Sequence, residues 1–392
     1  MTNPSTRERA LAALAALAFG FVIAGANSIN PLLPMLRVEV PLGPLGVSLT
    51  FVAYVSAAVL TLLVVGFSRV RVSPGAAVVV ALLVAACANA LLASPVDWQI
   101  LAGRAATGIA VGLATGGAAG LVVEALQGRG RGLAATGNLV GAVVGTAIAQ
   151  GVAAVESTAG VTLMYVTGAG VSLLLAVALL LLLRARAGAR VPQGEPPRST
   201  TDAAPSHRLT RADVGTILRA AIVWTGLSAG VVYAPTIFAD AAMPAAQFAG
   251  SVTMLVAAAI AQLGSAPLGR LLPRASGHLA FAVGAALAVT SVLTTSNALA
   301  FIALALVGGG GAVAYRTSLV HLTRGAAPKL QSVLASKFAV ATYAASASAV
   351  LTIGLLGGVL PTEIVLAAFA TLLSLAALLM HWRAPRLRDL SG

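Results

Sequence analysis

The chain contains little charge, one cysteine and few aromatic residues. Of its 392 residues, 9% are charged, 5% are aromatic, and Cys87 is the only cysteine. A soluble domain carries about 25% charged residues, so this composition excludes an ordinary water-soluble protein. One cysteine excludes an internal disulfide, and the four histidines lack the spacing of metal ligands. We therefore expect no metal and no cofactor, and we interpret Cys87 as a small buried packing residue.

Long apolar runs take the place of the missing charge. Hydrophobic residues make up 59% of the chain, and crossing a bilayer as a helix takes about 20 of them in succession. The sequence predicts an all-α membrane protein with twelve transmembrane helices. Their ranges are 11–36, 47–68, 74–94, 98–124, 132–155, 160–183, 215–239, 246–271, 277–296, 298–323, 331–357 and 361–382.

The charge of the gaps between these runs alternates in sign. The odd-numbered gaps hold one basic residue, Arg37, and the acids Glu39, Asp97, Glu156, Asp240 and Glu363. The even-numbered gaps hold Arg69, Arg71, Arg129, Arg131, Arg270, Arg274, Arg324 and Lys329. Because basic loops stay in the cytoplasm, we predict a multi-pass protein of the cytoplasmic membrane with both termini inside. The net charge of +13 then reflects topology, and we expect no nucleic-acid partner.

One long polar segment, 184–213, contains four prolines and six arginines. This composition is typical of a linker. It predicts an N-terminal six-helix bundle at 1–183, a cytoplasmic linker at 184–213 and a C-terminal six-helix bundle at 214–392. Parallel halves of this kind place a substrate site between them, near the bilayer midplane.

Several motifs resemble those of the major facilitator superfamily (MFS), over about 11–383. The first helix has a proline-broken end, Asn27-Ser28-Ile29-Asn30-Pro31, and a later helix carries Arg104, Gly108 and Gly112 in the pattern R-x-x-x-G-x-x-x-G. A basic loop lies between Gly264 and Gly277. The glycines Gly137, Gly141 and Gly145 are similar to the glycine-rich signature of exporters. Pro273 stands where the loop normally has an aspartate, and Thr146 where the exporter signature has proline. The resemblance implies the MFS fold of two pseudo-symmetric six-helix bundles, and a coupling or gating role for Arg104.

Arg104 is predicted about six residues, or roughly 9 Å, inside the outer end of its helix. A charge at that depth usually faces protein or water. We expect Arg104 to hydrogen-bond the polar face formed by Asn27 and Asn30 and to line the cavity. The alternative is that its side chain extends to the outer headgroups.

Glycines recur every four residues on the helix that carries Arg104. Gly108, Gly112, Gly116 and Gly120 lie along one ridge, which ends at Glu124. Such a ridge lets another helix backbone approach closely. Tight packing alone accounts for it; the functional hypothesis adds that smooth ridges let helices rock during transport.

Arg316 and Lys337 form a second group of charges inside predicted helices, at overlapping depths. Two cations without a carboxylate are unstable in the membrane unless water or an anion joins them. We expect them to attract an anionic or acid-bearing substrate, with Tyr315 and Tyr343 nearby. The alternative is that both reach the cytoplasmic lipid phosphates. Tyr233 and Gln262 are further predicted lining residues.

Coupling to protons needs a titratable group that meets both sides. The candidates for coupling or gating are Arg104, Glu124, Asp240, Arg270 and His321. His321 is the only histidine that we expect within a helix, and histidine changes charge near neutral pH. Protons are therefore a candidate partner beside membrane lipid and a small-molecule substrate.

The preferred function is efflux of a small amphipathic compound, with an acid-bearing compound as the sharper hypothesis, by a monomeric secondary transporter. Uptake or exchange of a small organic anion and facilitated diffusion stay open. A receptor or scaffold would need an appended soluble domain, and we expect no enzyme. The glycine run at 308–311 lies in an apolar helix without a preceding strand, so it is no phosphate-binding loop.

Overall fold

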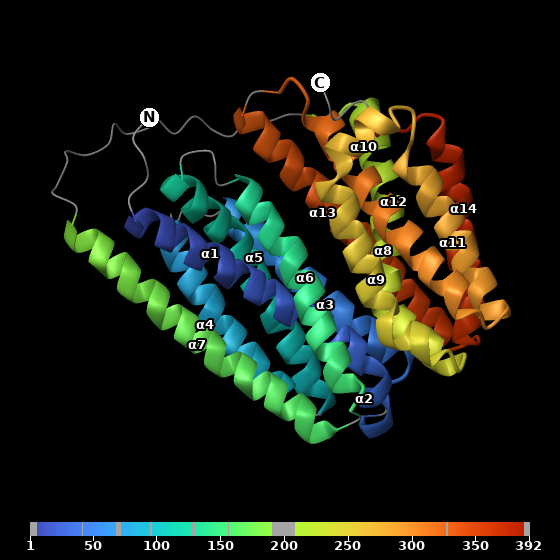
Figure 1. The fold of residues 1–392 in the computed structure, drawn as a ribbon, viewed down its shortest axis with the longest axis horizontal. Coiled ribbons are helices and arrows are strands. Elements are labelled where there is room, and N and C mark those ends of the chain that lie inside the picture. The colour runs from blue at the N-terminus through green and yellow to red at the C-terminus, as the bar shows by residue number, and fades with distance from the viewer. Residues whose placement is uncertain are drawn as a thin grey trace. The chain divides into compact units, whose positions relative to one another are not determined.

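The computed structural model describes residues 6–40, 42–67, 72–94, 96–126, 131–155, 157–189, 208–326 and 328–387. All regular elements within these ranges are helices (Figure 1). Ten helical segments are long and apolar enough to cross a membrane, and two shorter apolar helices cover Asn138–Ala153 and Gly277–Leu293. These segments coincide with the twelve predicted runs, so the all-α membrane fold is confirmed.

The chain divides into two compact units. Unit 1 comprises Met1–Pro41 and Ala53–Thr200, and unit 2 comprises Leu42–Val52 and Thr201–Gly392. The sequence pattern does not predict that Leu42–Val52 belongs to unit 2.

Within its described residues, unit 1 contains six helices and a short 3-10 helix. They are α1 (Thr6–Asn27), η1 (Asn30–Leu32), α2 (Leu33–Glu39), α4 (Pro74–Leu92), α5 (Asp97–Leu126), α6 (Arg131–Ala153) and α7 (Thr158–Ala189). A further helix, α3 (Pro44–Phe67), begins in unit 2 and ends in unit 1.

The described part of unit 2 contains seven helices besides the start of α3. They are α8 (Arg211–Asp240), α9 (Pro244–Leu263), α10 (Ser265–Leu271), α11 (Gly277–Leu293), α12 (Asn297–Thr323), α13 (Pro328–Gly357) and α14 (Thr362–His381).

Local sequence signals set several helix starts. Ser73 caps α4, because its Oγ accepts from the amide of Ala76 at 3.3 Å while Pro74 takes the first helical position. Thr210 and Asp213 form a reciprocal capping box at the start of α8. Such caps satisfy amides that have no partner within the helix.

Two predicted helices are interrupted, which corrects the predicted ranges 11–36 and 246–271. The first breaks after Asn27 and continues as η1 and α2, because Pro31 has no amide hydrogen and disfavours a helical residue before it. The second breaks at Gly264, three residues before Pro267, for the same reason. Each break leaves backbone carbonyls at a helix end without a helical partner.

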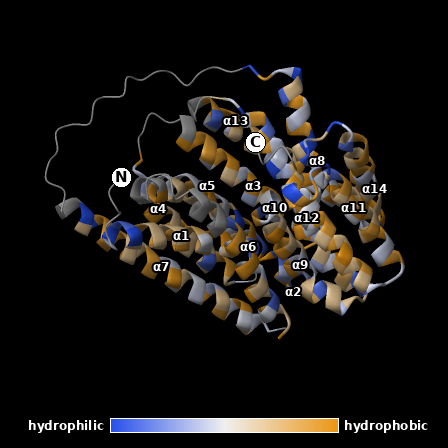
Figure 2. Cartoon of the chain, turned by 45° about the horizontal axis from the view of Figure 1, so that its top comes forward, coloured by the Kyte–Doolittle hydropathy of each residue, from blue (hydrophilic) through white to orange (hydrophobic). Residues whose placement is uncertain are grey.

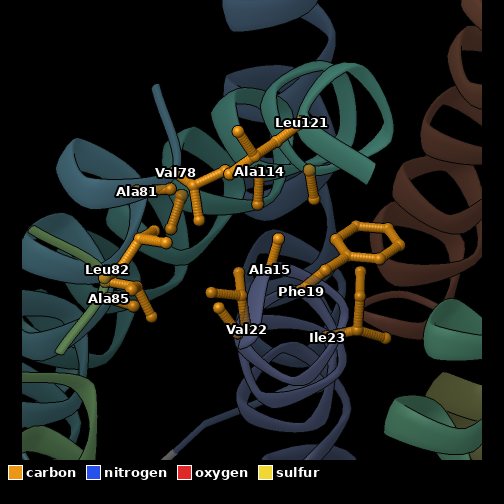
Figure 3. Packing of buried hydrophobic residues seen from close by; sticks show 14 of the residues in the cluster. Ala15, Phe19, Val22, Ile23, Val78, Ala81, Leu82, Ala85, Ala114 and Leu121 are labelled. Carbon is orange, nitrogen blue, oxygen red and sulfur yellow. The ribbon is translucent and has the colours of Figure 1, made fainter. Parts of the chain in front are cut away.

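Alanines make up nine of the nineteen buried residues in the main core cluster of unit 1. Figure 3 shows part of a cluster in which α1, α4 and α5 contribute side chains such as Ala15, Ala81 and Ala114, all with 0% exposure. Helices in membranes associate by close packing, which small residues permit. In unit 2 the main core cluster is formed by α8, α9, α11, α12 and α14 and includes Phe281 and Met254.

The outer helix faces are apolar and exposed. Only 17% of the most apolar window of α7 and 11% of that of α14 are buried. Cys87 is exposed on α4, so the prediction of a buried packing role is wrong. Apolar residues follow the helices along their length in Figure 2. These faces are suited to lipid, because water would disfavour so much exposed hydrocarbon.

Candidate functional site

The break in α1 is satisfied by Arg104 of α5. Ala26 lies in the last turn of α1, where the carbonyl has lost its helical donor. The Nη1 atom of Arg104 donates to this carbonyl oxygen at 2.7 Å. Arg104 is 1% exposed. Arg104 thus contacts helix one through the backbone of Ala26, whereas the prediction placed this contact on the polar face of Asn27 and Asn30. Its side chain is buried and does not extend to the surface of the protein.

An aromatic ring covers the other side of the Arg104 guanidinium. Its Cζ atom lies 4.5 Å from the centroid of the Tyr54 ring on α3. A cation over a ring face gains about 2 kcal/mol when both are shielded from water. Tyr165 of α7, 1% exposed, lies close enough to interact electrostatically with Arg104. Its hydroxyl accepts a long hydrogen bond, 3.4 Å, from Ser28.

The two asparagines predicted to face Arg104 have other environments. The Asn27 amide donates to the carbonyl of Ile23 at 2.9 Å, within its own helix. Asn30 is 4% exposed, and its Oδ1 atom is buried without a partner among the described residues. Because Arg104 itself is enclosed, it does not line an open cavity in this conformation, contrary to the prediction.

The glycine ridge of α5 serves two different neighbours. A Cβ atom at Gly108 would collide with the backbone carbonyl of Tyr54, and one at Gly112 would lie 2.7 Å from the Cβ of Thr61. Both glycines therefore admit α3 to close contact. At Gly120 a Cβ atom would meet Pro74 of α4 at 3.2 Å, whereas Gly116 has nothing within 4 Å. The ridge therefore packs against α3 at Gly108 and Gly112 and against α4 at Gly120.

Glycines on α6 admit α1 in the same way. A Cβ atom at Gly141 would collide with the carbonyl of Gly20, and one at Gly145 with that of Ala24. Gly141 and Gly145 therefore admit the backbone of α1 to close contact. The side-chain position at Gly137 lies outside the described residues.

In unit 2 the break after α9 is satisfied by Arg316 of α12. Gln262 lies in the last turn of α9, and its carbonyl accepts a hydrogen bond from the Nη1 atom of Arg316. A cation also complements the negative end of a helix dipole. Arg316 is half-buried. Arg316 and Gln262 were predicted separately as site residues, and the structure joins them through the backbone carbonyl of Gln262.

Four aromatic residues from α8, α12 and α13 form a cluster. Two of them are sequence neighbours of the predicted cations, Tyr315 of Arg316 and Phe338 of Lys337. The ring of Trp224 lies 4.5 Å from that of Tyr315 and 5.5 Å from that of Tyr343, and Tyr315 lies 4.9 Å from Phe338. We name Trp224, Tyr315, Phe338 and Tyr343 the aromatic cluster. The contact of Tyr315 with Phe338 joins α12 and α13, and each of these two residues is adjacent in sequence to one of the cations. Lys337 is half-buried.

The indole nitrogen of Trp224 is the notable polar atom of this cluster. Nε1 is buried and has no hydrogen-bond acceptor within the described part of the chain. An unpaired buried donor costs about 1–3 kcal/mol. A ligand that carries an acceptor oxygen would remove that cost.

Tyr233 lies elsewhere on α8, and its hydroxyl pairs with Ser48 at the start of α3. Ser48, 0% exposed, also donates to the carbonyl of Val350 on α13 at 2.7 Å. Gly354 leaves room for Ser48, since a Cβ atom there would collide with its Oγ. These contacts explain why Leu42–Val52 belongs to unit 2.

The predicted coupling residues other than Arg104 do not lie in a shielded site. Asp240, Arg270 and His321 are exposed, and the side chain of Glu124 lies outside the described residues. His321 is not the only helical histidine, which corrects that prediction. His278 in the first turn of α11 is 0% exposed, and its Nε2 lies 3.3 Å from the carbonyl of Arg219.

Sequence patterns identified the charges but missed most of their partners. Tyr54, Tyr165 and Trp224 stand alone in apolar runs, so spacing gives them no motif. A polar ring in such a run is the one signal that could have drawn attention to them. No group of three or more potential metal ligands occurs within the ranges that the structure describes.

Comparison with known proteins agrees with this architecture. The sequence model of the Major Facilitator Superfamily matches residues 15–350. A bacterial homologue of the human lysosomal transporter Spinster aligns with a TM-score of 0.74 at 13% identity, over 99% of this chain and 98% of that chain. The xylose transporter XylE from E. coli aligns with a TM-score of 0.68 at 12% identity, over 96% and 99%.

The nucleoside transporter NupG aligns with a TM-score of 0.66 at 14% identity, over 96% of this chain and 99% of that chain. These identities show a common fold alone. No curated protein sequence matches the chain.

Proposed function

This chain belongs to the Major Facilitator Superfamily and acts in membrane transport, and from that premise we propose that it exports a small amphipathic compound bearing an acid group. The compound would be carried by alternating access across the cytoplasmic membrane, with both termini inside. The basic residues of the even-numbered gaps support this orientation. The glycines Gly141 and Gly145 resemble those of exporters and support the direction.

The unpaired indole N–H of Trp224 is the observation that carries the substrate class. It lies in the aromatic cluster, whose rings suit an apolar or aromatic body. Arg316 follows Tyr315 and Lys337 precedes Phe338, so two cations flank the rings in sequence. A carboxylate would accept from the indole and gain from both charges.

We assign proton coupling to no residue, because the two titratable candidates, Asp240 and His321, are exposed. We propose that Arg104 acts in gating, because it joins α1, α3 and α5 through one guanidinium. A gate residue should affect the rate of transport for every substrate equally. A substrate-binding residue should affect acids more than neutral compounds.

The test is a proteoliposome assay with matched pairs of aromatic acids and their amides, with and without a pH gradient. The wild-type protein should transport the acids, and Trp224→Phe should raise their KM roughly tenfold, the equivalent of one hydrogen bond to a charged group. Val214→Phe provides a control on the exposed face of the same helix, and it should leave the KM unchanged.

Amides carried as well as acids, with no effect of Trp224→Phe, would contradict an acidic substrate. Inward flux in the absence of outward flux would favour uptake over export. Flux that depends only on the substrate gradient would indicate facilitated diffusion.

A further inference from the structure

Unit 2 contains a cavity of ≈ 300 Å³ that lies apart from the aromatic cluster. Its walls come from α8, α11, α12 and α14, and none of the four cluster residues lines it. Ligand pockets in proteins begin at about this volume. Since all four helices belong to unit 2, the cavity is a property of that unit alone.

The wall of this cavity is almost entirely hydrocarbon. Some of the lining residues are fully buried in the protein, among them Phe281 at 1% exposure and Leu304 at 3%. Tyr233 and Glu363 are the only lining residues with polar side chains. The Tyr233 hydroxyl is already paired with Ser48. A water molecule needs two to four polar partners, so this wall suits an apolar occupant.

The cavity has its mouth where α11 ends and α14 begins. Leu293 is 79% exposed and Ile364 59%, and both line it. From Glu363 to Leu373 the lining follows α14 for about 15 Å at 1.5 Å per residue. The hydrocarbon core of a bilayer is about 30 Å thick. The cavity therefore spans about half of the hydrocarbon core, which is the thickness of one leaflet. It lies at the end of α14 that is predicted to face outward.

α14 also lies at the surface that meets the membrane. Most of its apolar window is exposed, and Ala367 and Phe369 are half-buried at the cavity wall. A lipid chain would reach the cavity from its own leaflet without crossing water. At the mouth, the carboxylate of Glu363 is exposed and forms no ion pair with the described residues. It offers a counter-charge to an amine.

We propose that this cavity holds one hydrocarbon chain of an outer-leaflet lipid, with an amine-bearing headgroup beside Glu363. The chain packs against the ring of Tyr233, whose hydroxyl holds Ser48 at the start of α3. A bound lipid chain would therefore stabilise the position of Tyr233, which holds the segment Leu42–Val52 within unit 2 through Ser48. The proposal is independent of the transported substrate.

The test uses the full-length protein in nanodiscs and a dodecylamine probe with a diazirine near its methyl end, followed by peptide mapping. Label should appear on cavity-lining segments of α8, α11 and α14. Ala367→Phe fills the cavity from α14, and Ala288→Phe fills it from α11. Each should reduce labelling roughly tenfold, because excluding two methylenes already costs that much.

Ala368→Phe is the matched control, since Ala368 is the exposed neighbour of Ala367 and does not line the cavity. It should leave labelling unchanged. All variants should elute as the wild-type protein does in size exclusion. Label confined to the outer face of α14, and equal in all variants, would overturn the proposal.

The headgroup is tested with the matching dodecanoic acid probe. The amine should label more strongly than the acid, and Glu363→Gln should abolish this preference while labelling of the cavity persists. Equal labelling by both probes of the wild-type protein would overturn the role of Glu363.

Discussion

Arg104 donates to the carbonyl of Ala26 at 2.7 Å, and this bond closes the end of a helix that a proline has broken. Arg316 does the same for Gln262 at the end of α9. In both units an arginine of a long helix donates to a carbonyl at a helix end near a proline, and at Gln262 the Ser265 hydroxyl donates to the same oxygen at 2.8 Å. The charge is thereby stabilised by a backbone dipole.

Arg104→Lys should abolish most transport although it keeps the charge. Lysine lacks the planar fork that can donate to Ala26 and lie flat over Tyr54. Initial rates in proteoliposomes check this, with reconstituted protein quantified in each sample. A lysine variant that transports at the wild-type rate would show that charge alone is sufficient.

Tyr54 offers a matched pair of variants for the same contact. Tyr54→Phe keeps a ring under the guanidinium, whereas Tyr54→Leu removes it. We expect the leucine variant to lose about 2 kcal/mol more stability than the phenylalanine variant, measured by thermal unfolding in detergent. Equal loss in both would assign the effect to the hydroxyl group.

The glycines of α5 should tolerate alanine very unequally. Gly108→Ala forces a methyl group against the carbonyl of Tyr54, so α3 must move away. Overpacking of this kind costs about 1–3 kcal/mol, and transport should fall sharply. Gly116→Ala places its methyl group in open space and is the control. If both variants transport normally, close approach of α3 is not needed for function.

Ser48 and Tyr233 should be coupled in a double-mutant cycle. Ser48→Ala removes the bond to Tyr233 and the bond to Val350, while Tyr233→Phe removes only the first. The serine variant should therefore be the less stable, and the coupling energy should be about 1 kcal/mol. Stabilities that simply add would mean that the two hydroxyls do not interact.

Arg316 should matter both for substrate and for the end of α9. Arg316→Lys keeps a cation, and Arg316→Gln keeps a donor for the Gln262 carbonyl without charge. If the charge serves an acidic substrate, the glutamine variant should raise the KM for acids and leave that for amides unchanged. Equal effects on both substrates would restrict Arg316 to holding α9.

The sequence is sufficient to predict the helices, because a helix in lipid requires a long apolar run and basic residues mark the gaps between these runs. It is also sufficient for the ridge at Gly108 and Gly112, because small residues at a four-residue spacing favour close packing. The break before Pro31 follows from the missing amide hydrogen. The prediction instead continued the helix across it.

The partners of the buried charges could not be predicted. Asn27 and Asn30 were natural candidates to bind Arg104, yet the acceptor is the carbonyl of Ala26, a group that every residue carries. Likewise nothing in the spacing of Trp224, Tyr315 and Tyr343 brings three separate helices together. Such contacts depend on how helices rotate about their axes, which apolar runs leave undetermined.

The order of the chain gives the buried arginines a further property. Placing an arginine at the centre of a membrane costs about 2.5–3.5 kcal/mol on insertion scales. During synthesis, N-terminal segments are available first. Ala26 and Tyr54 precede Arg104, and Gln262 precedes Arg316, so each guanidinium enters the bilayer after its acceptors. Neither of these contacts therefore depends on a helix that is synthesised later.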